Sequence, residues 1–187
     1  MFDPGLLDDA SRLLNELRAR HLMIATAESC TGGLIAGLLT EIPGSSDVVD
    51  CGFITYSNGA KQQLIGVPAA LLARHGAVSA EVAMAMAEGA LKHAPQAAIT
   101  VAVTGVAGPG GGSDAKPVGL VHFGCALRGL PVVHLEQRFG DIGRSGIRLA
   151  TVRAAVDLLF HTLNQSSAAN PSVFAAFPLG REGAGGG

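Results

Sequence analysis

Hydrophobic positions along this chain follow two alternating patterns. Leucines in 5–20 recur at helical spacing and leave one apolar face, whereas 22–27 is a short continuous apolar run typical of a buried strand. The same alternation continues to residue 163. The expected elements are helices at 5–20, 34–41, 61–65, 80–94 (capped by Ser79) and 144–163, and strands at 22–27, 48–56, 97–103, 119–126 and 132–139.

Alternating helices and apolar strands predict an α/β fold, a three-layer α/β/α sandwich with a mixed, mostly parallel sheet. The mixed character comes from 128–131 (Arg-Gly-Leu-Pro), a turn that predicts an antiparallel hairpin. Residues 1–165 are expected to form one domain. Residues 166–187 are rich in Gly, Ala, Ser and Pro, lack core-forming periodicity, and are expected to be a flexible tail.

Composition narrows the class of protein. Charged residues make up 15% of the 187, hydrophobic residues 48%, and the formal net charge is −2. Bulk disorder is therefore excluded, and a nucleic-acid-binding role is disfavoured because no broad basic face is available. No apolar run reaches the ~18 residues of a membrane span, and the N-terminus does not resemble a signal peptide. We expect a cytoplasmic protein without membrane association.

Cysteines and histidines suggest neither disulfides nor metal. Cys30, Cys51 and Cys125 are dispersed and odd in number, which favours a reducing compartment. The six histidines show no metal-ligand spacing, so no metal is expected.

Two glycine loops follow apolar strands, where ligands bind in open α/β sheets. The first, 28–33, has two readings. Ser29 or Thr31 could cap the next helix. Alternatively, Ser29 could be a nucleophile on a sharp strand-to-helix turn, with backbone N–H groups around Thr31, Gly32 and Gly33 stabilising an anion.

The second loop, 104–114, resembles a dinucleotide fingerprint only loosely. Pro109 prevents a helix from opening where that fingerprint requires one, so a redox Rossmann site is disfavoured. A mobile loop and a backbone cradle for phosphate or ribose remain as alternatives.

Polar residues elsewhere allow two readings each. Lys61 could be solvated at a helix start, or could lose solvation and act as a neutral base. Tyr56, the single tyrosine, could be partial core or part of a site. Arg144 and Arg148 share a helix face and could be surface charge or a phosphate clamp.

Together these segments resemble the CinA C-terminal domain family, the nicotinamide mononucleotide deamidases, over about residues 5–163. The resemblance rests on 26–33 (TAESCTGG), 43–46 (PGSS), 52–58 (GFITYSN) with Lys61, 66–67 (GV), 75–79 (HGAVS), 104–109 (TGVAGP), 111–113 (GGS) and 116–119 (KPVG). The family's compact Phe-x-Gly-Asp-Arg run is expanded here to 139–144, and Arg144 matches its arginine most naturally.

The resemblance implies hydrolysis of the carboxamide of nicotinamide mononucleotide to nicotinate mononucleotide and ammonia, with no metal or other cofactor. The family's Ser–Lys pattern maps onto Ser29 as nucleophile and Lys61 as base. Tyr56 is expected to orient or relay, and Cys30 is the rival nucleophile. The expected substrate-binding residues are Cys30, Thr31, Gly32 and Gly33 at the first loop, Ser46, then Thr104, Gly105, Ala107, Gly108 and Arg144 for ribose and phosphate.

An alternative function and an oligomeric state are also expected. The alternative function is a non-catalytic nucleotide-binding or regulatory module linked to competence or DNA-damage responses. The apolar composition and the family favour a homodimer or a higher homo-oligomer.

Overall fold

Five strands form the central sheet, in the order β2-β1-β3-β4-β5. The computed structural model describes residues 2–169. The strands are β1 (Met23–Glu28), β2 (Val49–Ile54), β3 (Ala97–Gly105), β4 (Leu120–Leu127) and β5 (Val133–Arg138). β1 is parallel to both β2 and β3, whereas β4 is antiparallel to β3 and β5. All strands except β4 therefore point in one direction, which confirms a mixed, mostly parallel sheet.

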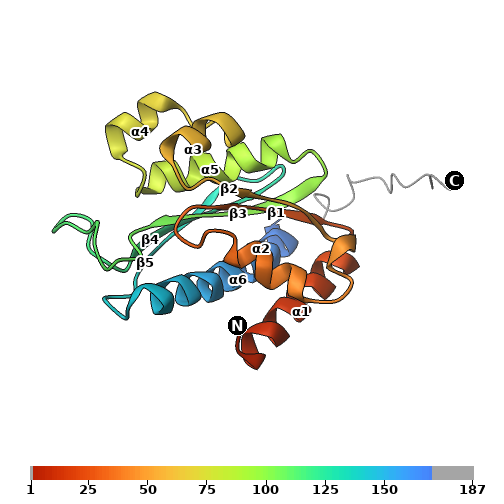
Figure 1. Cartoon of the computed structure of the whole chain (residues 1–187). Helices are drawn as coiled ribbons and strands as arrows, with labels where there is room; N and C mark the ends of the chain where they lie inside the picture. Colours follow the sequence, from red (N-terminus) through yellow and green to blue (C-terminus); the bar gives the residue numbers. More distant parts are fainter. Residues whose placement is uncertain (1, 170–187) are drawn as a thin grey trace, which may run out of the picture.

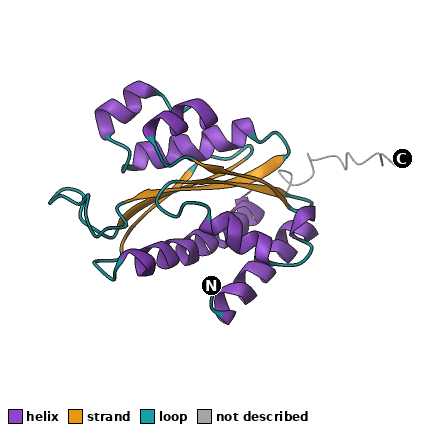
Figure 2. Cartoon of the chain, in the orientation of Figure 1, coloured by secondary structure: helices purple, strands orange, loops and turns teal. Residues whose placement is uncertain are grey.

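Helices cover both faces of this sheet (Figure 1). On one face lie α3 (Asn58–Ile65), α4 (Ala69–His75) and α5 (Ala80–His93), and on the other lie α1 (Pro4–Ala19), α2 (Leu34–Glu41) and α6 (Arg144–Ala169). A 3₁₀ turn, η1 (Ser45–Asp47), connects α2 to β2. The predicted three-layer sandwich is confirmed, and Figure 2 shows the strands enclosed between the two helical layers.

The burial of each strand follows from its place in the sheet. Nearly every residue of β1, β3 and β4 is buried, because helices cover these strands on both faces. The edge strand β5 alternates between half-buried and exposed positions. The larger core lies between the sheet and α1, α2 and α6, and a second core lies beneath α3, α4 and α5.

The structure departs from the predicted elements at three places. Ser57 accepts a hydrogen bond from the Ala60 N–H and caps α3, so this helix begins at Asn58 and not at the predicted residue 61. The seven-residue α4 was not predicted, because Leu72 is its single buried residue and no apolar stripe marks it. Helix α6 continues to Ala169, so residues 166–169 belong to a helix instead of the predicted tail. Residues 170–187 lie outside the described residues.

Two sequence expectations can be compared with residues 2–169. All three cysteines are free thiols. No helix in this range is both long enough and apolar enough to cross a membrane.

Candidate active site

The carboxyl ends of β1, β2 and β3 meet at one edge of the sheet, next to a cavity of about 200 Å³. The two parallel pairings bring together the residues that follow the three strands, as expected for an open α/β sheet. The cavity is lined by Ser29, Cys30, Tyr56, Lys61, Ala77, Val78, Thr104, Gly105, Ala107 and Arg144.

Ser29 and Lys61 are in direct contact in this cavity. Lys61 Nζ donates hydrogen bonds to Ser29 Oγ at 2.9 Å and to the Thr55 carbonyl at 2.7 Å. The side chain comes from the first turn of α3 and is 1% exposed, while Ser29 is 9% exposed. Loss of solvation lowers the pKa of Lys61 from 10.5 to about 8. A lysine with this pKa has a substantial neutral fraction near neutral pH and can accept a proton from the serine.

The backbone on either side of Ser29 is fixed by the sheet. The Ser29 N–H donates to the Val103 carbonyl at 3.1 Å, and the Thr55 N–H donates to the Glu28 carbonyl at 2.8 Å. Ser29 therefore lies at the point where β1 ends, between the neighbouring strands β2 and β3.

Glu28, which the sequence reasoning did not single out, caps helix α2. Its side chain is fully buried and accepts hydrogen bonds from the N–H groups of Gly33, Ile35 and Ala36 at 3.0, 3.0 and 2.8 Å. The Thr26 hydroxyl donates a fourth, at 3.2 Å. The prediction that Ser29 or Thr31 caps this helix is wrong, because the carboxylate already satisfies its N-terminal donors.

The glycine N–H groups are consequently engaged within the chain. Gly33 donates to Glu28, and Gly32 donates to the Ser29 carbonyl at 3.2 Å. The prediction that these two groups hold an oxyanion is wrong for this arrangement. Both glycines have positive φ values, 59° and 98°, so their observed role is to form the turn. Thr31 is fully buried, and neither it nor the two glycines line the cavity.

The environment of Cys30 disfavours a thiolate nucleophile. Burial is the main cause that raises its pKa to about 12, and the charge of Glu28 adds to this effect. The thiol is 6% exposed and stays protonated at neutral pH.

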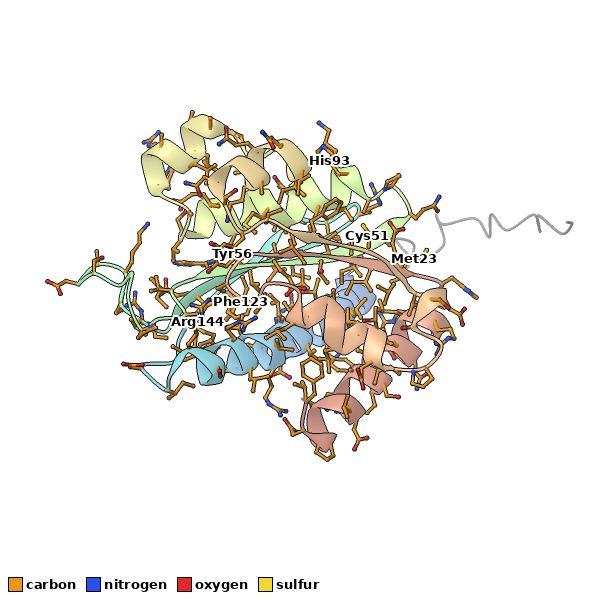
Figure 3. The ribbon with its side chains drawn as sticks, in the orientation of Figure 1. Met23, Cys51, Tyr56, His93, Phe123 and Arg144 are labelled. Atoms are coloured by element: carbon orange, nitrogen blue, oxygen red, sulfur yellow. The ribbon has the colours of Figure 1, made fainter. Side chains whose placement is uncertain are left out.

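Arg144 and Tyr56 both line the cavity, and Figure 3 shows where the two side chains lie on the fold. The Arg144 guanidinium donates to the Gly108 carbonyl at 2.9 Å and to the Tyr56 hydroxyl at 3.3 Å. Tyr56 is 62% exposed. Since its hydroxyl contacts Arg144 while Ser29 and Lys61 contact each other directly, Tyr56 is not placed as a proton relay. The structure brings Arg144 to the cavity despite the expanded 139–144 segment.

Arg148, on α6, donates hydrogen bonds to the backbone of the first glycine loop. It donates to the Cys30 carbonyl at 3.2 Å and to the Thr31 carbonyl at 2.7 Å. Its guanidinium is thereby directed at the turn, so of the two arginines on this helix face only Arg144 lines the cavity.

The second glycine loop forms the far wall. Thr104 donates to the Ala77 carbonyl at 2.8 Å, which joins β3 to the α4–α5 connection. A Cβ on Gly105 would lie 2.7 Å from the Leu120 carbonyl oxygen, so glycine is required for β4 to approach. Of the residues predicted here, Thr104, Gly105 and Ala107 line the cavity, and Gly108 meets it through Arg144.

Ser46 is a wrong prediction. It is exposed in η1, before the start of β2, whereas the cavity lies beyond the end of that strand. At about 3.3 Å per residue, β2 separates the two by roughly 20 Å. Within residues 2–169, no group of three or more His, Cys, Asp or Glu side chains could hold a metal ion.

Comparison with known proteins identifies the family. The model of the CinA C-terminal domain matches residues 8–163. A CinA-like protein of Synechococcus sp. strain RCC307 is 54% identical over 164 residues, covering 83% of this chain and 37% of the relative. A CinA-like protein of Geobacter sulfurreducens is 50% identical over 142 residues, covering 76% and 34%. This chain thus spans about a third of the length of these curated relatives.

Solved structures agree with this assignment. The competence/damage inducible protein CihA from Agrobacterium tumefaciens superposes with a TM-score of 0.85 at 54% identity, covering 88% of this chain and 98% of that one. A CinA superfamily protein from Klebsiella pneumoniae 700603 gives a TM-score of 0.81 at 34% identity, covering 86% and 98%. From the fold, the cavity and these matches, the chain belongs to the CinA C-terminal domain family.

Proposed function

We propose that this protein is an amidohydrolase that converts nicotinamide mononucleotide into nicotinate mononucleotide and ammonia. The observation that carries the proposal is the 2.9 Å contact between Ser29 Oγ and a buried Lys61 whose pKa is lowered to about 8. An amide is a poor electrophile with a poor leaving group, and an activated nucleophile with an adjacent base answers both difficulties.

The first half-reaction forms an acyl-enzyme. Neutral Lys61 takes the Ser29 hydroxyl proton as Ser29 Oγ bonds to the carboxamide carbon. The proton then passes from Lys61 to the amide nitrogen, the C–N bond breaks, and ammonia leaves. The N–H of Cys30 is the expected oxyanion donor, because the residue after the nucleophile takes this role on strand-to-helix turns and Cys30 lines the cavity.

The second half-reaction releases the acid. Water attacks the ester carbon, Lys61 accepts its proton, and the bond between the acyl carbon and Ser29 Oγ breaks as the proton returns from Lys61 to Ser29 Oγ. The enzyme is regenerated with one water consumed, and the product carries a carboxylate where the substrate carried a carboxamide.

The mouth of the cavity suits a phosphorylated ribose. Arg144 donates here to two neutral acceptors, the Gly108 carbonyl and the Tyr56 hydroxyl. A phosphate forms stronger, charge-assisted hydrogen bonds with a guanidinium, so it would replace these partners. The pyridine ring would then occupy the cavity beside Thr104 and Gly105.

Release of ammonia tests the proposal. The protein is incubated with nicotinamide mononucleotide or with free nicotinamide, and ammonia and nicotinate mononucleotide are quantified. We expect equal amounts of both products from the mononucleotide, and loss of both in Ser29→Ala. Cys51→Ser, at a free thiol on β2 away from the cavity, is the matched control. Binding of the mononucleotide without ammonia at high protein concentration would overturn hydrolysis and favour a nucleotide-binding module.

A further inference from the structure

The turn that carries Ser29 is held by a buried carboxylate that does not line the cavity. Glu28 is 0% exposed and directly precedes Ser29, yet its side chain points away to the N-terminus of α2. A buried charge of this kind is costly unless every lone pair is used. Here both oxygens accept two hydrogen bonds each, from Ala36 and Thr26 on one side and from Gly33 and Ile35 on the other.

This arrangement fixes the spatial relation between β1 and α2. The Glu28 backbone is the last residue of β1, where it pairs with Ile54 of β2 and Val103 of β3. Its carboxylate simultaneously holds the first turn of the helix that follows. The intervening residues, 29–32, must close between two anchored ends, and Ser29 is the first of them.

We propose that Glu28 is a positioning residue for the nucleophile, which directs Ser29 Oγ at Lys61 by clamping α2 to the end of β1. The proposal rests on the proposed function only in taking Ser29 as a reactive nucleophile, and it goes beyond that function in assigning the source of the serine's orientation. A neutral or shorter side chain would leave N–H groups of α2 unsatisfied and let the turn relax.

The exchange Glu28→Gln tests this with little change in shape. A glutamine has one acceptor oxygen, and its NH₂ group would face N–H donors that now bind a carboxylate. Because reaction requires close alignment, a displacement near 1 Å is enough to slow the serine by about 100-fold. The helix itself can persist, because its other contacts with the core are unchanged.

The readout is phosphonylation of Ser29 by a fluorophosphonate, followed by intact-protein mass. In this reaction the serine oxygen bonds to phosphorus, fluoride leaves, and Lys61 accepts the hydroxyl proton. It reports the reactivity of Ser29 without any nucleotide. In the wild type we expect labelling at Ser29 with a pH midpoint near 8, the pKa of Lys61. In Glu28→Gln we expect the same midpoint with a rate about 100-fold lower.

A second capping carboxylate provides the matched control. Asp3 caps α1 by accepting a hydrogen bond from the Leu6 N–H at 3.0 Å, remote from the cavity. Asp3→Ala removes this cap, so it should lower the melting temperature and leave the labelling rate within about twofold of the wild type. If Glu28→Gln does not fold, Glu28→Asp replaces it. This variant keeps the charge on a side chain one methylene shorter, and its labelling rate should fall by at least about tenfold.

Each outcome decides one question. A folded Glu28 variant that is labelled at the wild-type rate would overturn the positioning role, as would absence of labelling in the wild type. Rapid wild-type labelling without release of ammonia from nicotinamide mononucleotide would overturn the proposed function and leave the role of Glu28 intact.

Discussion

Lys61 Nζ and Ser29 Oγ are 2.9 Å apart although 32 positions separate the two residues in the chain. The parallel pairing of β1 with β2 produces this contact, because it places the residues that follow both strands at one edge of the sheet. Neither residue is distinctive by itself. The proposed nucleophile and base roles rest on their contact inside a cavity.

The choice between serine and cysteine as nucleophile can be made with single substitutions. Ser29→Ala should lower kcat by at least about 1000-fold, because the acyl-enzyme can no longer form. Cys30→Ser should keep turnover within about threefold, since a thiol with a pKa of about 12 supplies no thiolate at the pH of the assay. Steady-state ammonia release measures both variants. Loss of turnover in Cys30→Ser with retention in Ser29→Ala would reverse the assignment.

The pH dependence of kcat/KM should report the base. In the proposed reaction Lys61 acts in its neutral form, so activity should rise with pH and level off above a midpoint near 8. In Lys61→Ala the residual rate should lack this rise. A wild-type profile that is flat between pH 6 and about 9 would contradict a lysine base.

Replacement of Lys61 by an apolar residue should raise the stability of the fold although it abolishes activity. The pKa of Lys61 falls from 10.5 unfolded to about 8 folded, so the unfolded state binds more protons between these values and stability rises with pH across this range. Below pH 8 the folded protein contains a buried ammonium group at full cost. Lys61→Met should therefore raise the free energy of unfolding at pH 7 by about 1–3 kcal/mol while abolishing turnover.

Urea unfolding at two pH values measures this effect. The gain in Lys61→Met should shrink toward pH 10.5, where both states of the wild type approach neutrality at this side chain. Lys92→Met, at an exposed position in the last turn of α5, should shift stability by no more than about 0.5 kcal/mol. A lower stability of Lys61→Met at pH 7 would show that its hydrogen bonds outweigh the desolvation.

Recognition of the phosphate should depend on Arg144. Arg144→Ala removes the guanidinium at the cavity mouth and should raise KM for nicotinamide mononucleotide by about 10–100-fold, the usual value of hydrogen bonds to a charged group. The rate with nicotinamide riboside, which lacks the phosphate, should be unchanged. Arg138→Ala, at an exposed arginine paired with Glu136 on β5, is the control. Equal losses with both substrates would place Arg144 elsewhere in the reaction.

The sequence predicted the architecture well, for identifiable reasons. Continuous apolar runs give β1 and β3 because helices bury both faces of these strands, and the 128–131 turn gives the β4–β5 hairpin. Ser29, Lys61 and Arg144 could be placed together because the family resemblance joins segments that are far apart in the chain.

What the sequence did not predict depends on hydrogen bonds across the fold. Glu28 caps α2 from the preceding strand, five residues before the N-cap, and no local capping pattern has that spacing. Arg148 binds two carbonyls of the first loop from 117 and 118 positions away. Ser46 was misplaced for a different reason, because η1 precedes β2 whereas the cavity lies beyond the end of that strand.

Two helical glycines, Gly37 in α2 and Gly89 in α5, should respond in opposite ways to replacement by alanine. Alanine normally stabilises a helix relative to glycine, so Gly37→Ala in α2, where a Cβ would meet nothing within 4 Å, should stabilise by about 0.5–1 kcal/mol. Gly89 in α5 is different, because its Cβ would lie 1.9 Å from the Ile65 carbonyl oxygen at the end of α3. Gly89→Ala must separate these two helices and should destabilise by about 1–3 kcal/mol. Thermal unfolding of both variants measures the contrast, and since Ile65 lies one turn beyond Lys61, Gly89→Ala should also slow ammonia release. Equal stabilisation by both alanines would show that α3 does not pack on α5 as closely as this structure has it.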